Sequence, residues 1–235
     1  SMYLTYTNEG MPIGAFWGYK TDGLIQTQEQ LNAVKRADFQ PNAELGDVLF
    51  VDTNGDGKLD SSDRCMIGNP IPDIIYGINM GMAWKGFDLN LQFGGTIGNQ
   101  IFNAMRYYTY FPNDITNKDR ALMNYWTPNN TNTDIPRLTA TDVNDNDRFS
   151  DMYVENGTYF RLRNAQLGYT LPASLTQRIK LQKVRFYVSG QNLFTISSYS
   201  GMDPEVGQSS SLSRGIDYGI YPQNISFTGG INVTF

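Results

Sequence analysis

The stretch Tyr76–Phe93, with the sequence YGINMGMAWKGFDLNLQF, alternates strictly between two kinds of side chain. Large apolar residues occupy every second position on both of its arms, and small or polar residues lie between them. Lys85 and Gly86 interrupt the alternation and are predicted to form a two-residue turn. With this turn, Trp84 faces Phe87, Met82 faces Leu89, Met80 faces Leu91 and Ile78 faces Phe93. The stretch is therefore predicted to be a β-hairpin with one continuous apolar face.

The opposite face of this hairpin carries Gly, Asn, Gln and Ala, whereas Lys, Glu and Thr usually cover the outside of a soluble β-sandwich. Apolar side chains facing outward, small or polar ones facing inward, and aromatics beside the turn are typical of transmembrane β-barrel strands. The lipid interior has no water to hydrogen-bond with unpaired backbone groups, so such strands must pair with each other in a closed barrel. An ordinary sandwich hairpin is the alternative that this stretch alone would favour, and the rest of the chain shifts the balance toward a barrel.

The composition agrees with a barrel and excludes several kinds of function. Of 235 residues, 40% are hydrophobic, 13% aromatic and only 17% charged, against about 25% charged in an average soluble domain. The net charge of -5 argues against nucleic acid as a partner, because no basic cluster is present to follow phosphates. The chain has one cysteine, Cys65, and no histidine, which excludes an internal disulfide, Cys-rich or His-ligated zinc sites and Ser-His or Cys-His catalysis. No residue is a catalytic candidate, and we expect a protein that is not an enzyme.

Further alternating segments predict strands over Tyr159–Tyr169, Val184–Phe194 and Ile225–Phe235. Within the first of these segments, the parity of the apolar positions changes near Arg163 and Asn164. A change of parity moves side chains from one face of a sheet to the other, so it indicates a β-bulge at this point.

The connections between the predicted strands alternate between short and long. The hairpin turn and the connection 172–183 are short, whereas 97–158 and 197–223 are long and polar. Bacterial outer-membrane barrels have short periplasmic turns and long outer loops. The alternation therefore agrees with a barrel segment whose two long loops are extracellular.

We expect two parts in the chain. Residues 1–74 are predicted to hold the end of a strand and a region of extracellular loops, and residues 75–235 to hold barrel strands with their loops. In the first part, residues 10–23 are punctuated by glycine and rich in aromatics, which predicts a packed irregular loop. Thr27 and Gln30 have the spacing of a capping box, which predicts a short helix.

A short predicted strand, 46–51, leads into a segment with the spacing of a calcium loop. Oxygen-bearing side chains stand at positions one, three, five, nine and twelve, glycine at six allows the sharp turn, and position seven offers its carbonyl oxygen. The predicted ligands are Asp52, Asn54, Asp56, Lys58, Asp60 and Asp63. Position twelve is Asp rather than Glu and no helix precedes the loop, so we expect a structural Ca²⁺ site with a Kd of about 10⁻⁴–10⁻³ M. The alternative is an Asp/Asn/Gly turn that needs no metal.

Aromatic residues gather in the long segment 97–158. Aromatics on a large loop can stack on sugar rings or receive a partner protein, and more often they form the loop's own small core. The candidates for contact with a substrate or partner are Tyr107, Tyr108, Tyr110, Phe111 and Trp126.

Several motifs taken together resemble one known family. They are PIGAFWGY at 12–19, Gly46-Asp47 with the DTNGDG that follows at 52–57, IGNPIP at 67–72, GTYFRLRN at 157–164, LGYTLP at 167–172, SGQNLF at 189–194, YSGMDPE at 199–205 and the terminal Phe235. Over almost its whole length the chain is similar to the carboxy-terminal part of SusC/RagA-type TonB-dependent outer-membrane transporters.

The resemblance implies an all-β fold, namely an antiparallel transmembrane segment with about the last five or six strands of a barrel of roughly 22 strands. It also implies import of oligosaccharides or peptides, a SusD-like surface lipoprotein as partner and outer-membrane lipid around the strands. TonB would act through an amino-terminal part that this chain lacks. The implied location is the outer membrane of a Gram-negative bacterium. By resemblance, the signal for barrel assembly would comprise Phe227, Ile231, Val233 and Phe235.

The chain opens with Ser1 and Met2 and has neither a signal peptide nor an apolar run of the ~18 residues that a spanning helix needs. We therefore expect it to be cut from a longer protein and not to transport alone. The rival hypothesis is a soluble, secreted, calcium-stabilised β-module for adhesion or glycan binding, which the calcium-type loop by itself would allow. Burial of residues such as Ile78, Leu91 and Phe227 in a dry interior would favour that module.

Overall fold

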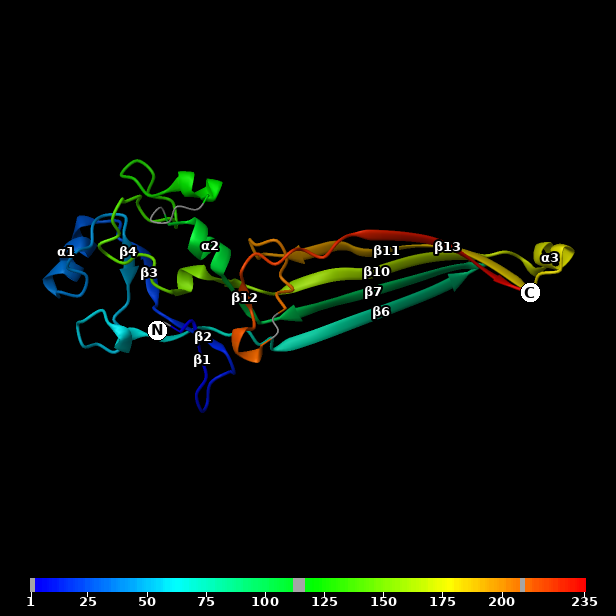
Figure 1. Ribbon diagram of the computed structural model, residues 1–235, viewed down its shortest axis with the longest axis horizontal. Coiled ribbons are helices and arrows are strands. Elements are labelled where there is room, and N and C mark those ends of the chain that lie inside the picture. Colours follow the sequence, from blue (N-terminus) through cyan, green and yellow to red (C-terminus); the bar gives the residue numbers. More distant parts are fainter. Residues whose placement is uncertain (1–2, 112–116, 208–209) are drawn as a thin grey trace. The chain divides into compact units, whose positions relative to one another are not determined.

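The computed structural model describes residues 3–111, 117–207 and 210–235. The chain divides into two compact units, whose segments are coloured along the sequence in Figure 1. Unit 1 comprises residues 1–71, 100–156 and 205–220, and unit 2 comprises residues 72–99, 157–204 and 221–235. Among the described residues, no helix has the length and apolarity that crossing a membrane would require.

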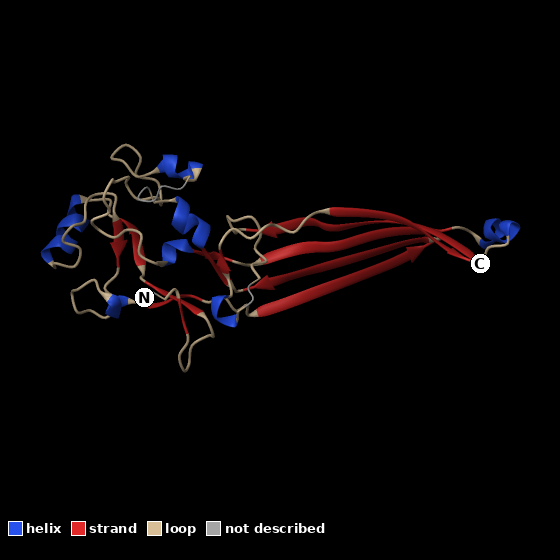
Figure 2. Ribbon diagram, viewed as in Figure 1, coloured by secondary structure: helices blue, strands red, loops and turns tan. Residues whose placement is uncertain are grey.

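Unit 2 is built on one antiparallel sheet of long strands (Figure 2). In the order of the sheet, its strands are β13 at Ser226–Thr234, β11 at Lys183–Ser197, β10 at Tyr159–Thr170, β7 at Phe87–Ile97 and β6 at Ile74–Trp84. The helix α3, Ala173–Thr176, and the 3-10 turn η4, Gln177–Ile179, connect β10 to β11. The predicted strands are confirmed. The sequence could predict them because side chains alternate between the two faces of a strand, and here the two faces differ in polarity.

The hairpin of β6 and β7 pairs in the register that the sequence predicts. Lys85 and Gly86 both have positive φ, 46° and 87°, as expected for a tight turn whose twist matches that of the strands. The observed partners are Ile78 and Phe93, Met80 and Leu91, Met82 and Leu89, and Trp84 and Phe87.

The predicted bulge in β10 is also confirmed. The register shifts between Leu162 and Asn164 against both neighbours, β7 and β11. On β11 the irregularity includes Asn192, which has a φ of 53°. The bulge therefore lets apolar side chains stay on one face on both sides of the parity change.

Unit 1 contains short elements joined by loops. They are β1 (Thr5–Tyr6), β2 (Ala15–Gly18), β3 (Thr21–Leu24), α1 (Gln28–Arg36), β4 (Val48–Phe50), η1 (Ser61–Asp63), β5 (Cys65–Gly68), β8 (Gln100–Asn103), α2 (Ala104–Thr109), η2 (Arg120–Asn124), η3 (Asp151–Tyr153), β9 (Val154–Asn156), η5 (Ser211–Ser213) and β12 (Ile216–Asp217). Small sheets have the orders β1-β2-β5, β12-β8-β9 and β3-β4. The capping box of α1 is confirmed, because the Thr27 side chain accepts from the Gln30 backbone and the Gln30 side chain accepts from the Thr27 backbone.

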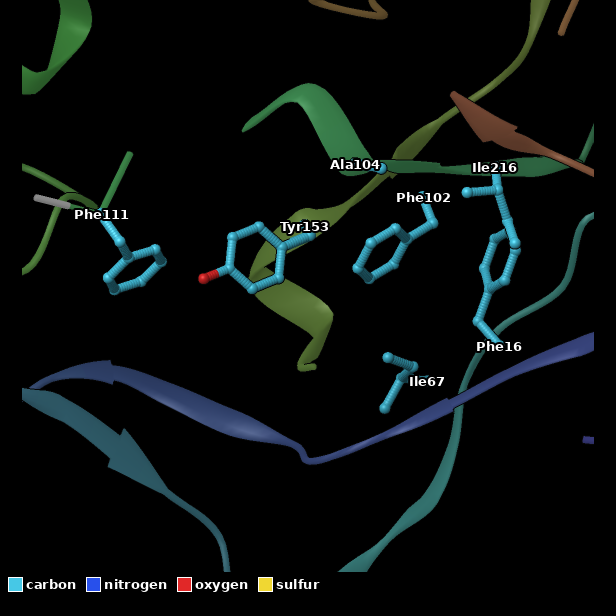
Figure 3. Packing of buried hydrophobic residues seen from close by; sticks show 7 residues of the cluster. All are labelled: Phe16, Ile67, Phe102, Ala104, Phe111, Tyr153 and Ile216. Atoms are coloured by element: carbon cyan, nitrogen blue, oxygen red, sulfur yellow. The ribbon is translucent and has the colours of Figure 1, made fainter. Parts of the chain in front are cut away.

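The largest apolar core of unit 1 gathers residues that are far apart in sequence. Figure 3 shows the Tyr153 ring between Phe111 and Phe102, with Phe16 and Ile216 beyond Phe102. The ring centroids of Phe102 and Tyr153 lie 5.7 Å apart. These side chains come from β2, β8, η3, β12 and the beginning of the loop that follows α2, so this core holds otherwise irregular segments together.

The structure corrects two predictions about local structure and adds detail to a third. Residues 10–23 contain β2 and β3 rather than only an irregular loop, and the long segment 97–158 contains β8, α2 and β9. These strands are four residues or shorter, too few to show a period. The expected division of the chain into 1–74 and 75–235 stays a prediction. In the structure, residues 100–156 and 205–220 pack in the same compact unit as residues 1–71.

Candidate functional site

One face of the unit 2 sheet is apolar across all of its strands, and we call it the apolar face. In one row across the sheet, Leu91 pairs with Met80 on one side and with Ala165 on the other. In the next row on the same face, Leu167 pairs with Val188. Its large members are Ile78, Met80, Met82, Trp84, Phe87, Leu89, Leu91, Phe93, Phe160, Leu162, Leu167, Tyr169, Phe186, Val188, Phe194, Ile196, Phe227, Ile231 and Val233.

Many side chains on the apolar face are open to the surroundings. Val188 is 60% exposed and Phe227 79% exposed, and Ile78, Met80 and Ile231 are exposed as well. Soluble proteins rarely expose a continuous apolar patch larger than a few hundred square ångströms, and larger ones mark contact with a membrane or partner. The face is therefore suited to an apolar medium, and the dry interior that would favour a soluble module is not found around these residues.

Aromatic rings mark both ends of the apolar face. Beside the hairpin turn, the rings of Phe87 and Tyr169 lie 4.5 Å apart. Toward the other end of the strands, the rings of Phe93 and Phe160 stack at 5.2 Å. Aromatic residues at two levels with aliphatic residues between them are the arrangement that lies at the two interfaces of a membrane. The hairpin sequence predicts the aromatic residues beside the turn. The pair of Phe93 and Phe160 at the far end could be recognised only from the observed register between β7 and β10.

The opposite face of the sheet, the polar face, carries amides and glycine. Asn79, Asn90, Gln92 and Asn164 line a hollow of about 320 Å³ on this face, together with Gly81. Neutral amides donate and accept hydrogen bonds without a net charge, which suits contact with water or uncharged polar groups. One face is therefore apolar and the other polar, as expected for a wall with lipid on one side and water on the other.

A buried ion pair lies where β10 meets the loop after β11. The Arg161 side chain donates from Nη2 to Asp203 Oδ1 at 2.5 Å and from Nε to Thr195 Oγ1 at 2.8 Å. The Arg161 and Asp203 side chains are only 2% and 6% exposed. Asp203 also accepts from the Gln223 backbone N–H at 3.0 Å. Sequence reasoning missed this pair, because its partners are 42 positions apart and nothing local links them.

The predicted calcium loop is closed by hydrogen bonds from its own backbone. Asp52 accepts from the N–H groups of Gly55 and Gly57, and buried Asp63 accepts from those of Thr53 and Asp60. The Gly57 N–H is the largest cause that lowers the pKa of Asp52. These contacts favour the ionised form of the Asp52 carboxylate and hold the Asp52 and Asp63 side chains in place.

The oxygen-bearing residues of this loop are of the types that bind Ca²⁺, but their side chains are not arranged as a full set of metal ligands. Among the described residues, no group of three or more Asp, Glu, Cys or His side chains converges as metal ligands would. Asn54 and Asp56 accept from backbone N–H groups two residues further on, as in a metal-free Asx turn. Binding of Ca²⁺ by Asp52, Asn54, Asp56, Lys58, Asp60 and Asp63 stays a prediction.

Most of the aromatics predicted to contact a substrate or partner pack inside unit 1. Phe111 belongs to the core of Figure 3, and Tyr107 and Tyr110 pack against it. Trp126 is buried in a separate cluster, where its indole N–H donates to Gln26. Tyr108 is 49% exposed, so its ring is open to a ligand in this structure.

The predicted assembly signal lies at the end of the sheet. Phe227, Ile231 and Val233 share the apolar face on β13, which pairs with β11, and Phe235 follows that strand and is exposed. Their common orientation agrees with a terminal strand that meets lipid or an assembly partner. Recognition by assembly machinery stays a prediction.

Comparison with known proteins finds relatives over nearly the whole chain. No family model matches. The chain is 39% identical over 237 residues to the TonB-dependent receptor P3 of Formosa agariphila, which covers 97% of this chain and 22% of the relative. It is 29% identical over 198 residues to the TonB-dependent receptor SusC of Bacteroides thetaiotaomicron, covering 84% of this chain and 18% of the relative. The chain therefore spans about a fifth of the length of these curated relatives.

Solved structures show the same fold. A chain of the RagAB peptide transporter matches with a TM-score of 0.71 at 24% identity, over 99% of this chain and 24% of that chain. A chain of the RagAB peptide importer in its open-open state matches equally well, with a TM-score of 0.71. At this identity the likeness concerns the fold alone. It confirms the predicted fold class, an all-β antiparallel segment of a transmembrane barrel.

Proposed function

This chain is homologous to part of the SusC/RagA-type TonB-dependent receptors, and on that premise we propose that it forms a section of the wall of an outer-membrane transporter. The observation that carries the proposal is the contrast between the two faces of the unit 2 sheet. The apolar face is exposed and bounded by aromatics, and the polar face is rich in amides and glycine. Lipid on one side and a watery lumen on the other account for both.

We further propose that the complete receptor imports oligosaccharides or peptides across the outer membrane of a Gram-negative bacterium with a SusD-like surface lipoprotein. The identity to the TonB-dependent receptor SusC and the likeness of fold to the RagAB peptide importer support this proposal. Energy would come from TonB through the part of the receptor outside this chain. Relatives of this class are receptors rather than enzymes, and we assign no catalytic step to this chain.

The wall hypothesis is tested by placing a charge on either face at neighbouring positions. Leu91 lies on the apolar face between Met80 and Ala165, and Asn90 lies next to it on the polar face. Arginine on the lipid side near the middle of a membrane costs about 2–4 kcal/mol, whereas lumen positions tolerate charge. Leu91→Arg in the full-length receptor is therefore expected to lower its amount in the outer membrane, and Asn90→Arg is the matched control.

The readout is the heat-modifiable band of the receptor on a detergent gel of purified outer membranes. Retention of the folded band by Asn90→Arg with its loss or destabilisation in Leu91→Arg supports the wall. Equal tolerance of both substitutions would contradict it, and so would recovery of the receptor from the water-soluble fraction.

Import and partnership need a separate experiment. Affinity purification of the full-length receptor from detergent-extracted outer membranes is expected to retain a surface lipoprotein. Deletion of the receptor is expected to abolish growth on one class of oligosaccharide or peptide and to leave growth on monosaccharides or free amino acids unchanged. A receptor that purifies without a lipoprotein and whose loss leaves growth unchanged on every oligosaccharide and peptide tested would refute this part.

We also propose that the final strand carries the assembly signal. Phe235→Ala is expected to lower the amount of folded receptor in the outer membrane. The matched control is Tyr221→Ala, which alters an equally exposed aromatic outside the strands. Equal amounts of folded receptor for both variants would remove the assignment.

A further inference from the structure

The polar face of the unit 2 sheet changes from open to covered along its strands. On β7, Asn90 and Gln92 are exposed, whereas Gly94, the next residue of that face, is buried. Arg161, its neighbour on β10, and Tyr159 are only 2% and 5% exposed. The covered part is the end of the sheet that lies away from the hairpin turn.

The loop between β11 and β13 contributes to this cover. Arg161 lies between Phe160 and Leu162, which are both on the apolar face, so its side chain leaves the sheet on the polar face. Thr195 is the partner of Arg161 on β11 and accepts from Arg161 Nε at 2.8 Å. Asp203, which accepts from Arg161 Nη2 at 2.5 Å, therefore lies over the polar face as well. This part of the loop folds back along the polar side of the sheet.

Both limbs of the loop are held there, and all of the residues involved belong to unit 2. The outgoing limb includes Tyr199, which is 8% exposed. On the returning limb, the Gln223 backbone N–H donates to Asp203 Oδ2 at 3.0 Å, and the Asn224 carbonyl accepts from Asn192 Nδ2 at 3.2 Å. One carboxylate thus joins β10 to both limbs. Because breaking a buried pair leaves a charge without compensation, the loop is expected to stay in this position.

We propose that residues 199–204 line the lumen at the outer end of the wall and narrow it, with Asp203 as the residue that positions them. This inference rests on the proposed function, because the polar face bounds a lumen only if the sheet is part of a barrel wall. The segment leaves Met202 open to solvent, at 69% exposure, while Asp203 is buried. A solute that passes this level meets the loop and Met202 rather than Arg161 and Tyr159 of the strand.

The test is the rate at which single cysteines of the purified full-length receptor react with maleimides in detergent, with Cys65 and any other cysteine replaced by serine. Met202→Cys is treated with a small maleimide and with the same group on a long polyethylene glycol chain. A narrowed lumen is expected to admit the small reagent and to slow the bulky one severalfold. Leu175→Cys, exposed in α3 at the other end of the strands, is expected to react with both alike. Ile231→Cys on the apolar face is expected to be protected from both by the detergent.

The positioning role of Asp203 is tested in the Met202→Cys receptor. Asp203→Asn keeps the size of the side chain and removes its charge, which weakens the bond to Arg161. It is expected to speed the bulky reagent by about tenfold or more and to leave the small reagent unchanged. Asp88→Asn is the matched control, because it breaks an ion pair of the same face that joins two strands, Asp88 with Arg185. The heat-modifiable band shows whether each variant is folded.

Slow reaction of Met202→Cys with the bulky reagent that Asp203→Asn relieves and Asp88→Asn does not supports the inference. Equal rates of the two reagents at Met202→Cys overturn it, and so do equal effects of the two Asp variants. If Asp203→Asn does not fold, the comparison of the two reagents at Met202→Cys decides alone. Equal rates there with a protected Ile231→Cys leave the wall standing, whereas ready reaction of Ile231→Cys contradicts the wall itself.

Discussion

The Arg185 guanidinium and the Asp88 carboxylate form a two-point ion pair on the polar face of the long sheet, with Nε donating to Oδ2 at 2.8 Å. Their strands, β11 and β7, are not neighbours, because β10 lies between them. Gly168 of β10 lies beneath the pair, and a Cβ there would stand 2.5 Å from Asp88 Oδ2 and closer still to Arg185 Nη2. The missing side chain lets the pair bridge three strands.

Replacing this glycine is expected to break the bridge. Gly168→Ala forces apart a pair whose side chains are 15% and 26% exposed, and the expected loss in free energy of unfolding is about 1–2 kcal/mol. Gly77→Ala on β6 is the matched control, because its nearest neighbour would be the Phe93 carbonyl oxygen at 3.8 Å. Denaturant unfolding of the full-length receptor in detergent measures both. Equal stability of the two variants would show that the pair contributes nothing at this site.

The buried pair of Arg161 and Asp203 is expected to matter more. Asp203→Ala removes the carboxylate from a guanidinium that is 2% exposed, and breaking a buried pair costs about 3–5 kcal/mol. Asp145→Ala breaks the Arg148 pair, whose acid is 62% exposed, and the expected cost is below about 1 kcal/mol. The same unfolding measurement applies. A similar small loss in both variants would mean that solvent reaches Arg161 more freely than its burial indicates.

The strands of the long sheet were predictable from the sequence, and so were the individual residue pairs in the hairpin of β6 and β7. Strict alternation fixes which side chains share a face of the strand, and the two-residue turn then fixes the register between β6 and β7. This is why Met80 opposes Leu91 as expected, and why the parity change near Arg163 located the bulge. These features rest on short-range pattern, which a single sequence contains in full.

Unit 1 was predictable only in pieces. The capping box identified α1 because both of its partners lie within one helical turn. By contrast, β12 pairs in parallel with β8 through Ile216 and Phe102, and neither strand is long enough to show a period. The buried Gln40 side chain likewise donates to Asn144, which is 104 positions away. Contacts of this range follow from the packing of the whole unit and leave no local signal.

Calcium binding by residues 52–63 has a direct test. We propose that the full-length receptor binds Ca²⁺ through this loop with a Kd of about 10⁻⁴–10⁻³ M, measured by calorimetric titration after chelation. Asp56→Ala removes one exposed ligand and is expected to weaken binding by about tenfold. Asp22→Ala alters an exposed carboxylate of the same unit outside the loop and is the control. Heat of binding that is absent, or equal in all three proteins, would identify the segment as a metal-free turn.

The loop around Asp142 is expected to lose stability as the pH rises. Burial is the largest cause that raises the pKa of Asp142 above its usual 3.8, and the charge of Asp47 adds to it, while Asp142 Oδ1 is buried without a hydrogen bond among the described residues. A carboxyl whose pKa is higher in the folded state holds more protons there than when unfolded. The free energy of unfolding therefore falls with increasing pH, from 3.8 up to the raised pKa.

Asp142→Asn removes that titration and is expected to increase the hydrogen-exchange protection of residues 139–150 at about pH 8, with little change below about pH 4. The measurement is hydrogen exchange with mass spectrometry on the full-length receptor, corrected for intrinsic exchange rates. Asp22→Asn supplies the control, because it removes an exposed carboxylate from the same unit. Unchanged protection in Asp142→Asn at high pH would indicate that the Asp142 carboxylate is hydrated when ionised, and the attribution of pH sensitivity to this loop would fail.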